Sequence, residues 1–301
     1  MTPGGIPRRH RRARPWRGGN LRTARPARDQ PQRELSGYTP RGSSMRVVSL
    51  NCSNTEIVCA LGCADRLVGV DRDSDWPTDV VERLPRVGRD LQIDIEQVQA
   101  LRPDLVLASL TVPGHEKVVA GLESAGLPHY APETITLDDA YTDIREIARR
   151  LGVTERAEPV VADMRRALEA PPAAKDRRRP SVLVQWWPKP VIAPGRRSWV
   201  HEMIERAGGH NPLGDEPVKS RPLDDAEVAA LAPDAIVLSW CGVRTENYRA
   251  DEVYKREAWQ HLDVVRQRRV FTIPEAYLGR PGPRLAEGAR ALRDVIAAIR
   301  C

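Results

Sequence analysis

The sequence predicts an α/β protein made of two similar Rossmann-like lobes, joined by one long backbone helix, with a ligand cleft between the lobes. Short apolar segments alternate with amphipathic ones from residue 45 onward, as strands alternate with helices. The phrase ALRPDLVLAS at 100–109 returns as ALAPDAIVLS at 230–239. Such self-similarity indicates two related lobes rather than one continuous sheet.

The N-terminal lobe is expected at 45–152. Its predicted strands are 45–50, 67–70, 104–109 and 129–132, and its predicted helices are 53–61, 94–101, 114–125 and 137–151. Ser53 and Glu56 have the spacing of a capping box, with Ser at the N-cap and Glu at N3. Gly62 is expected to end that helix. The order of elements is typical of a sheet covered by helices.

The backbone helix and the C-terminal lobe follow, at 153–172 and 173–301. The helical pattern covers 154–170, and a helix of about 17 residues would span roughly 25 Å, enough for a rigid strut. The second lobe repeats the scheme of the first. Its strands are predicted at 181–186, 191–193 and 270–273, its helices at 198–209 and 283–300, and a helix followed by a strand at 224–240.

Charge separates the first 44 residues from the rest. Residues 1–44 carry eleven arginines against Asp29 and Glu34, a net charge of +9, so the other residues hold 36 basic and 39 acidic side chains, a net of −3. The Arg-, Pro- and Gly-rich tail is predicted to be disordered, either as a basic arm or as upstream sequence read in frame before Met45. The folded part has no surplus of positive charge, so we expect no specific nucleic-acid partner.

The sequence shows neither a secretory leader nor a membrane span. No apolar run of about 7–15 residues follows the basic start, and no stretch reaches about 18 apolar residues. We therefore expect a cytoplasmic protein as written, or an extracytoplasmic one if the N-terminus is misassigned. Five cysteines, an odd number, argue against a disulfide framework, and no fourth ligand accompanies Cys52, Cys59 and Cys63 for zinc. No metal site is expected.

Candidate ligand-binding residues lie where predicted strands end, because ligands of α/β proteins sit beyond the carboxyl ends of strands. These positions are Asn51, Ser53, Asn54, Asp73, Asp75, Trp76, Ser109, Trp186, Trp187, Trp240, Tyr277 and Arg280. Four of the seven tryptophans are among them, which favours a cleft for a flat, partly apolar ligand, whereas core packing would account for one or two. Arg89 adds a guanidinium for a carboxylate or phosphate group.

Signals for catalysis are weak. The sequence contains no GxSxG, no Walker A phrase, no HExxH and no GxGxxG after the first strand. The six histidines are scattered. We therefore expect a binding protein and not an enzyme, and no catalytic residue is assigned.

Several phrases carry a family resemblance that spans roughly 46–300. They are RVVSLNCSNTEIVCALG, GVDRDSDWP, LPRVG, DIEQVQALRPDLVLAS, VLVQWWPKPVIAPGRRSWVHEMIERAGGHN, ALAPDAIVLS and YLGRPGPR. In them the chain resembles the cobalamin-binding and ferric-siderophore-type substrate-binding proteins of ABC importers, the class III binding proteins with a helical backbone. The resemblance implies a ligand held between two lobes with little hinge motion.

The resemblance also implies functional positions. Ligand-facing residues would be Asp73, Trp76, Asp90, Ser109, Trp186 and Arg280. One carboxylate per lobe would dock on the permease. Glu96 matches the first, and the second falls at Ala226, beside Glu227, which we take in its place.

The expected function is that of a substrate-binding protein for a corrinoid or a related metal chelate such as a siderophore or haem. It would deliver this ligand to an ABC importer or hold it in the cytosol. No obligatory cofactor is expected, the partners are the chelate and possibly an ABC permease, and the chain is expected to be a monomer. The alternative is an enzyme that modifies a corrinoid or another tetrapyrrole, with Asp73 or Asp75 as general base.

Overall fold

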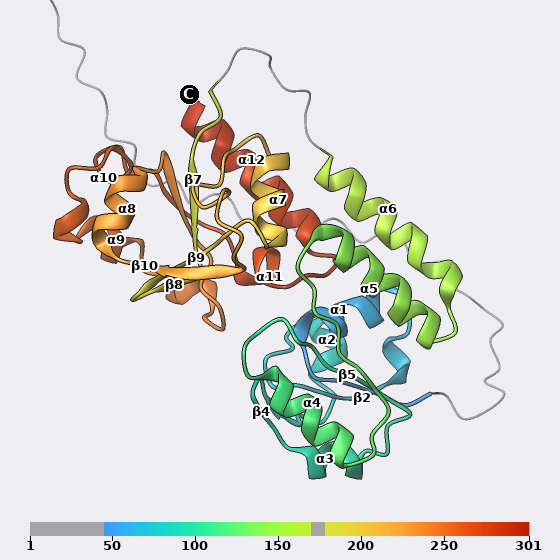
Figure 1. Cartoon of the computed structure of the whole chain (residues 1–301). Helices are drawn as coiled ribbons and strands as arrows, with labels where there is room; N and C mark the ends of the chain where they lie inside the picture. Colours follow the sequence, from blue (N-terminus) through green and yellow to red (C-terminus); the bar gives the residue numbers. More distant parts are fainter. Residues whose placement is uncertain (1–44, 170–177, 301) are drawn as a thin grey trace, which may run out of the picture. The chain divides into compact units, whose positions relative to one another are not determined.

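Two separate parallel sheets form the centres of the two lobes (Figure 1). The computed structural model describes residues 45–169 and 178–300. The predicted Arg-rich tail, 1–44, lies outside the described residues, and so do 170–177 and 301.

The N-terminal sheet has the strand order β2-β1-β5-β6 and is parallel throughout. Its strands are β1 Val47–Ser49, β2 Leu67–Val70, β5 Leu105–Leu107 and β6 His129–Tyr130. Val47 packs into one hydrophobic core with helices α1 and α5, and Val48 packs into another with α3 and α4. Consecutive strand residues face opposite sides of a sheet, so helices cover both faces, and this explains the uninterrupted apolar run.

The helices of this lobe agree with the prediction to within a few residues. They are α1 Cys52–Ala60, α3 Ile95–Ala100, α4 His115–Ser124 and α5 Leu137–Arg150. The segment after β2 holds three smaller elements, the helix α2 Thr78–Val81 and the hairpin β3 Gly88–Arg89 with β4 Gln92–Ile93. Gly62 follows α1 with φ +68°, a left-handed conformation that suits glycine, so its predicted role at the helix end is confirmed.

The C-terminal lobe contains a second parallel sheet, with the strand order β12-β11-β7. Its strands are β7 Val182–Gln185, β11 Ala235–Leu238 and β12 Val270–Thr272. An antiparallel sheet lies beside it, built from β8 Trp187–Pro188, β9 Val191–Pro194 and β10 Ser220–Leu223. The helices are α7 Trp199–Arg206, α8 Asp225–Leu231, α9 Ala250–Tyr254, α10 Asp263–Arg266, α11 Glu275–Leu278 and α12 Leu285–Arg300.

The repeated phrase builds the same structure in both lobes. At the ends of α3 and α8, Arg102 and Ala232 take the left-handed conformation, with φ +46° and +41°. Arg102 lies two residues after α3, and Ala232 lies directly after α8. Two residues later, Asp104 and Asp234 each accept a hydrogen bond, at 2.7 Å, from the backbone N–H that precedes the first strand of their lobe. The helix, the turn and the strand therefore have matching geometry, and the prediction of two lobes built alike is confirmed.

The segment between the lobes is helical but shorter than predicted. A single 3-10 turn, Thr154–Arg156, leads into α6 Ala157–Leu168, a helix of 12 residues. At 1.5 Å per residue it spans about 18 Å instead of the expected 25 Å. It packs against α5 of the first lobe and α12 of the second. The lobe boundaries at 152 and 172 stay predictions.

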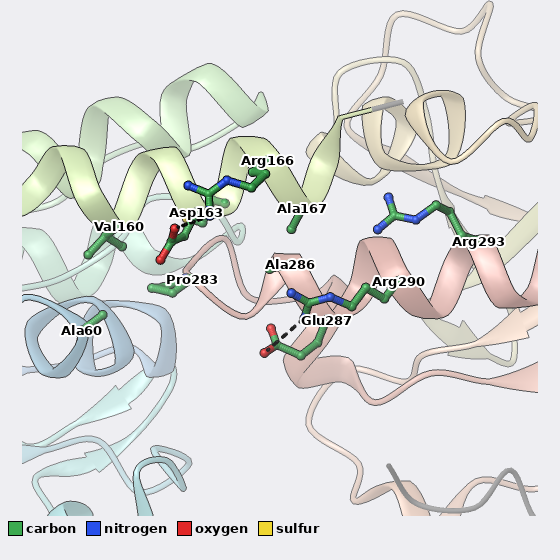
Figure 2. A pocket seen from close by; sticks show the side chains of 11 residues that line it. Ala60, Val160, Asp163, Arg166, Ala167, Pro283, Ala286, Glu287, Arg290 and Arg293 are labelled. Atoms are coloured by element: carbon green, nitrogen blue, oxygen red, sulfur yellow. Dashed lines mark hydrogen bonds and ion pairs between the residues drawn. The ribbon is translucent and has the colours of Figure 1, made fainter. Parts of the chain in front are cut away.

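A groove of about 720 Å³ follows this helix on the side of α12 (Figure 2). Its lining residues come from α1, α6, α12 as far as Arg293 and Pro283 just before α12, and none of them belongs to the predicted ligand site. Two of its arginines are paired within their own helices, Arg166 with Asp163 at 2.9 Å and Arg290 with Glu287 at 3.9 Å. The groove is therefore a separate feature, beside the predicted strut and away from the strand ends.

Candidate ligand-binding site

The loop after β2 is tied down by the carboxylate of Asp71. This carboxylate accepts hydrogen bonds from the Ser74 hydroxyl and from the backbone N–H of Asp73, the latter at 2.9 Å. Burial raises its pKa. Ser74 also contacts the hydroxyl of Thr55 in α1 at 2.8 Å. These hydrogen bonds fix the part of the loop that directly precedes Asp75 and Trp76.

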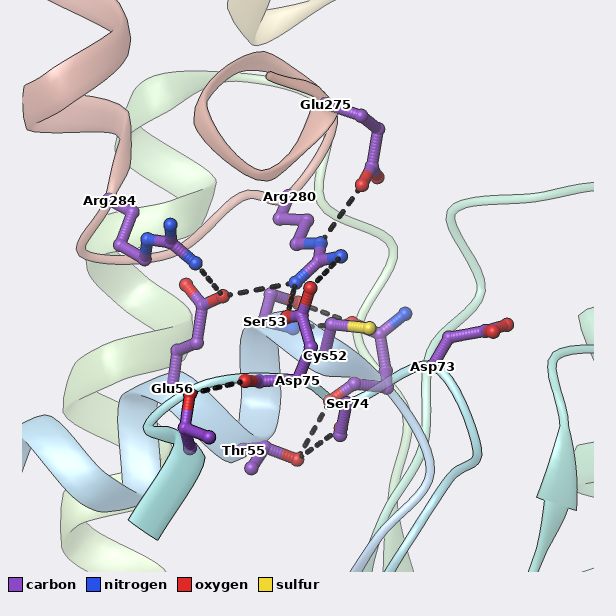
Figure 3. A network of polar contacts seen from close by, with 12 residues as sticks. Cys52, Ser53, Thr55, Glu56, Asp73, Ser74, Asp75, Glu275, Arg280 and Arg284 are labelled. Atoms are coloured by element: carbon purple, nitrogen blue, oxygen red, sulfur yellow. Dashed lines mark hydrogen bonds and ion pairs between the residues drawn. The ribbon is translucent and has the colours of Figure 1, made fainter. Parts of the chain in front are cut away.

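Arg280, just after α11, joins the two lobes through three carboxylates (Figure 3). Its guanidinium contacts Asp75 at 2.5 Å and Glu56 at 3.3 Å, both in the first lobe, and Glu275 of its own lobe at 3.0 Å. The Arg280 side chain is 11% exposed and that of Glu56 only 3%. We call Arg280, Arg284, Glu56, Asp75 and Glu275 the inter-lobe cluster.

Glu56 does not cap its helix, so the predicted capping box of Ser53 and Glu56 is wrong. The N-cap of helix α1 is Asn51, two residues before the predicted N-cap, Ser53. The Asn51 side chain accepts a hydrogen bond from the Ser53 N–H at 3.0 Å. This places Glu56 inside the helix, where it faces Arg280 and Arg284 at 3.3 Å each. Burial outweighs the attraction of both arginines and raises the pKa of Glu56 to about 7.

Arg284 lies between two aromatic rings from different lobes. Its guanidinium carbon is 5.2 Å from the ring centre of Trp76 and 4.8 Å from that of Tyr277. Both distances are within the range of cation–π attraction. The Trp76 ring is thus attached to the second lobe along one face, while 49% of the residue is exposed.

The four predicted tryptophans have different surroundings. Trp76 and Trp187 are exposed, one in each lobe, as a ligand platform requires. Trp186 is half-buried, and its ring centre is 6.3 Å from that of Trp199. Trp240 is 5% exposed and belongs to the core of the second lobe, where its indole N–H donates to Gln185 at 2.9 Å. The expectation that Trp240 lines the cleft is therefore wrong, because its ring fills the core.

Of the other residues predicted to bind ligand, some form ion pairs within the protein and others are buried. Asp73 pairs with Arg89 at 2.8 Å, and Asp90 pairs with His115 at 2.9 Å, which lowers the pKa of Asp90. Ser53, Asn54 and Ser109 are buried within the first lobe, so they contribute to its structure at the strand ends rather than an open surface.

Sequence reasoning missed one member of the inter-lobe cluster, Glu275. Glu275 opens the one-turn helix α11, and burial raises its pKa. The only local signal is its spacing from Arg280, five residues on across that turn. The contact with Asp75 bridges 205 residues of sequence, which no local pattern reveals.

Of the two predicted docking carboxylates, only Glu96 forms no ion pair within the described part of the chain, residues 45–169 and 178–300. Glu96 is exposed in the first turn of α3. Glu227 caps α8 through the Asp224 N–H at 2.9 Å and pairs with Arg221 at 2.7 Å. The neighbouring carboxylate of the second lobe, Asp225, pairs with Arg256 at 3.3 Å.

The fold and this site at the carboxyl ends of parallel strands define a bilobed solute-binding protein. A family model described as "Periplasmic binding protein" matches residues 47–277. The chain belongs to that family, and it is a substrate-binding protein of the kind that serves ABC importers.

Relatives and solved structures agree on this class. An uncharacterized ABC transporter substrate-binding lipoprotein of Bacillus subtilis is 31% identical over 83% of this chain and 79% of its own length. A vitamin B12-binding protein of Vibrio cholerae is 28% identical over 79% of this chain and 84% of its own. The apo structure of a periplasmic heme-binding protein from Roseiflexus matches with a TM-score of 0.73 and 28% identity, over 86% of this chain and all of that one.

These findings correct the expected location. The prediction of a cytoplasmic protein is wrong, because the family is periplasmic and the Bacillus relative is a lipoprotein, both of which indicate a place outside the cytoplasm. No helix of residues 45–169 and 178–300 is long and apolar enough to cross a bilayer. The expected class of binding protein agrees with the family, whose members bind a solute rather than use a cofactor, and the alternative of an enzyme has no support.

Proposed function

We propose that this protein binds a flat metal chelate of the corrinoid type between its lobes and delivers it to an ABC importer. The observation that carries the proposal is the pair of exposed indoles, Trp76 in the loop after β2 of the first lobe and Trp187 in β8 of the second. An indole exposed to this extent is costly unless a partner covers it. The vitamin B12-binding relatives are consistent with a corrinoid.

The two rings would supply most of the contact area. Covering on the order of 100 Å² of each ring, at about 25 cal/mol per Å², contributes roughly 2.5 kcal/mol per ring before ordering costs. Trp186 would add area beside Trp187 in the second lobe. Tyr277 would act through Arg284, which packs on one face of Trp76 and leaves the other face for the ligand.

The stacking role predicts that Trp76→Ala weakens cyanocobalamin binding about tenfold or more, because one of the two flat contacts is lost. Isothermal titration of the purified protein measures the effect. Trp76→Phe keeps a flat apolar ring and should retain most of the affinity. An unchanged dissociation constant for the alanine variant, with an unchanged melting temperature, would remove Trp76 from the site.

Docking to the permease is proposed to use Glu96 in the first lobe. Its carboxylate is exposed on α3, whereas Glu227 is engaged by the cap of α8 and by Arg221. Glu96→Arg is expected to reduce import by the cognate ABC importer about tenfold, since it reverses a charge at the contact, while leaving ligand binding intact. Uptake of radiolabelled cyanocobalamin into cells checks this, with Glu82→Arg, another exposed acidic residue of the same lobe, as the control. Equal uptake by the Glu96 variant and the wild type would rule out this contact.

A further inference from the structure

Trp76 offers a ligand only one of its two faces. The Arg284 guanidinium covers the other face, with its carbon 5.2 Å from the centre of the ring. The same guanidinium also lies over the ring of Tyr277. The same guanidinium contacts Glu56 at 3.3 Å. Tyr277 and Glu56 hold the Arg284 guanidinium, and this guanidinium in turn packs on Trp76. The orientation of the Trp76 ring is therefore set by the second lobe as well as by its own loop.

The group next to this platform is a carboxylate. Asp75 precedes Trp76, and its side chain is 62% exposed. Its oxygens contact Arg280 at 2.5 and 3.4 Å, so the carboxylate is held by Arg280 and cannot turn away without breaking that pair.

The two guanidinium groups that contact Trp76 and Asp75 are outnumbered by the carboxylates around them. Arg280 and Arg284 face three carboxylates, those of Glu56, Asp75 and Glu275, which leaves the inter-lobe cluster with one excess negative charge when all are ionised. The second oxygen of Glu56 is buried and has no hydrogen-bond partner among the described residues. When all three acids are ionised, negative charge is therefore in excess in the cluster that contacts the ring.

We infer that Asp75 selects ligands whose edge beside Trp76 carries hydrogen-bond donors, such as primary amides or a cationic group, and rejects ligands that carry carboxylates there. The inference rests on the proposed function, since it assumes a flat chelate on Trp76. A carboxylate at this edge would face Asp75 across a few ångströms, with Arg280 already shared among three acids. An amide N–H would instead donate to the exposed oxygens of Asp75.

Two probes that share the same corrin macrocycle distinguish a preference for amides from a preference for carboxylates. Dicyanocobinamide has side chains that end in amides, and dicyanocobyrinic acid has carboxylates in their place. Isothermal titration of the full chain at about pH 8 is expected to show about tenfold or greater preference for the amide probe. Equal affinity, or tighter binding of the acid, would overturn the inference while the proposed function stands. If neither probe binds, the proposed function itself fails.

Three variants then assign the preference to Asp75. Asp75→Asn removes the charge and leaves an amide on Arg280, so the preference should fall about fivefold or more, mainly through tighter binding of the acid probe. Asp75→Glu keeps the charge and should keep the preference. Asp163→Asn, an exposed acid on α6 far along the backbone helix, is the matched control and should change neither affinity. An unaltered preference in Asp75→Asn, with the fold verified by its thermal melt, would exclude Asp75 as the selecting group.

Discussion

Replacing Arg280 by methionine is expected to lower the free energy of unfolding by about 3–5 kcal/mol at about pH 8. The reason is the position of its partners, since Glu56 is buried, the Glu275 side chain is only 18% exposed, and Asp75 comes from the other lobe. Removing the cation from a buried ion cluster leaves uncompensated carboxylates in a medium of low polarity, which costs far more than an exposed pair. Urea denaturation followed by circular dichroism measures the loss.

The matched control for this prediction is Arg166→Met. Arg166 pairs with Asp163 at 2.9 Å on the surface of α6, with both side chains at least 70% exposed. An exposed pair of this kind contributes about 0–1 kcal/mol. A loss in Arg280→Met no larger than that in Arg166→Met would show that the cluster does not hold the lobes. Because Glu56 can take up a proton at lower pH, the loss should shrink toward about pH 5.

The architecture was accessible from the sequence because it is encoded locally and twice. In both lobes the repeated phrase carries an apolar strand, a helix, and a proline–aspartate pair after the turn. Asp104 and Asp234 then fix the same connection in each lobe by accepting the same backbone hydrogen bond. Either copy of the phrase alone would be a weak indication of a helix followed by a strand. Because the phrase occurs twice, it predicts two lobes of the same fold class.

Elements without such a pattern were missed. Strand β10, Ser220–Leu223, has the sequence SRPL, which shows no apolar alternation and includes a proline at an edge position. Its place in the antiparallel sheet depends on pairing with β9, a contact that the local sequence does not encode. The start of α1 was also misplaced, because Asn51 and Ser53 both have capping side chains and only the backbone decides between them.

The sequence indicates a candidate site at the strand ends, but it does not indicate what each of its residues contacts. Trp76 and Trp240 both follow strands, so the sequence predicts a ligand-binding role for both of them equally. In the structure Trp240 is packed against Tyr248, with ring centres 5.4 Å apart, and it is bonded to Gln185, whereas Trp76 projects from a polar loop. Which of two equivalent rings is covered depends on neighbours distant in sequence, so pattern alone could not tell them apart.

Glu56 is expected to make the stability of the protein depend on pH in the direction opposite to that of an ordinary ion pair. Its pKa rises from 4.5 to about 7 on folding, since burial disfavours the charged form more than Arg280 and Arg284 favour it. The folded protein therefore binds a proton that the unfolded chain releases between these two values. The contribution is fully present below about pH 4.5 and is lost as the pH rises through 7, by about 3 kcal/mol in all.

Glu56→Gln isolates this contribution, because glutamine resembles the protonated acid and does not titrate. The variant should have nearly wild-type stability at about pH 5, and between about pH 5 and 8 it should gain roughly 2–3 kcal/mol relative to the wild type. Urea unfolding of both proteins at the two pH values gives this difference directly, and groups common to both cancel. A variant that instead loses more stability at pH 8 than at pH 5 would mean that the two arginines hold Glu56 ionised, and the inter-lobe cluster would then be an ordinary ion-pair network.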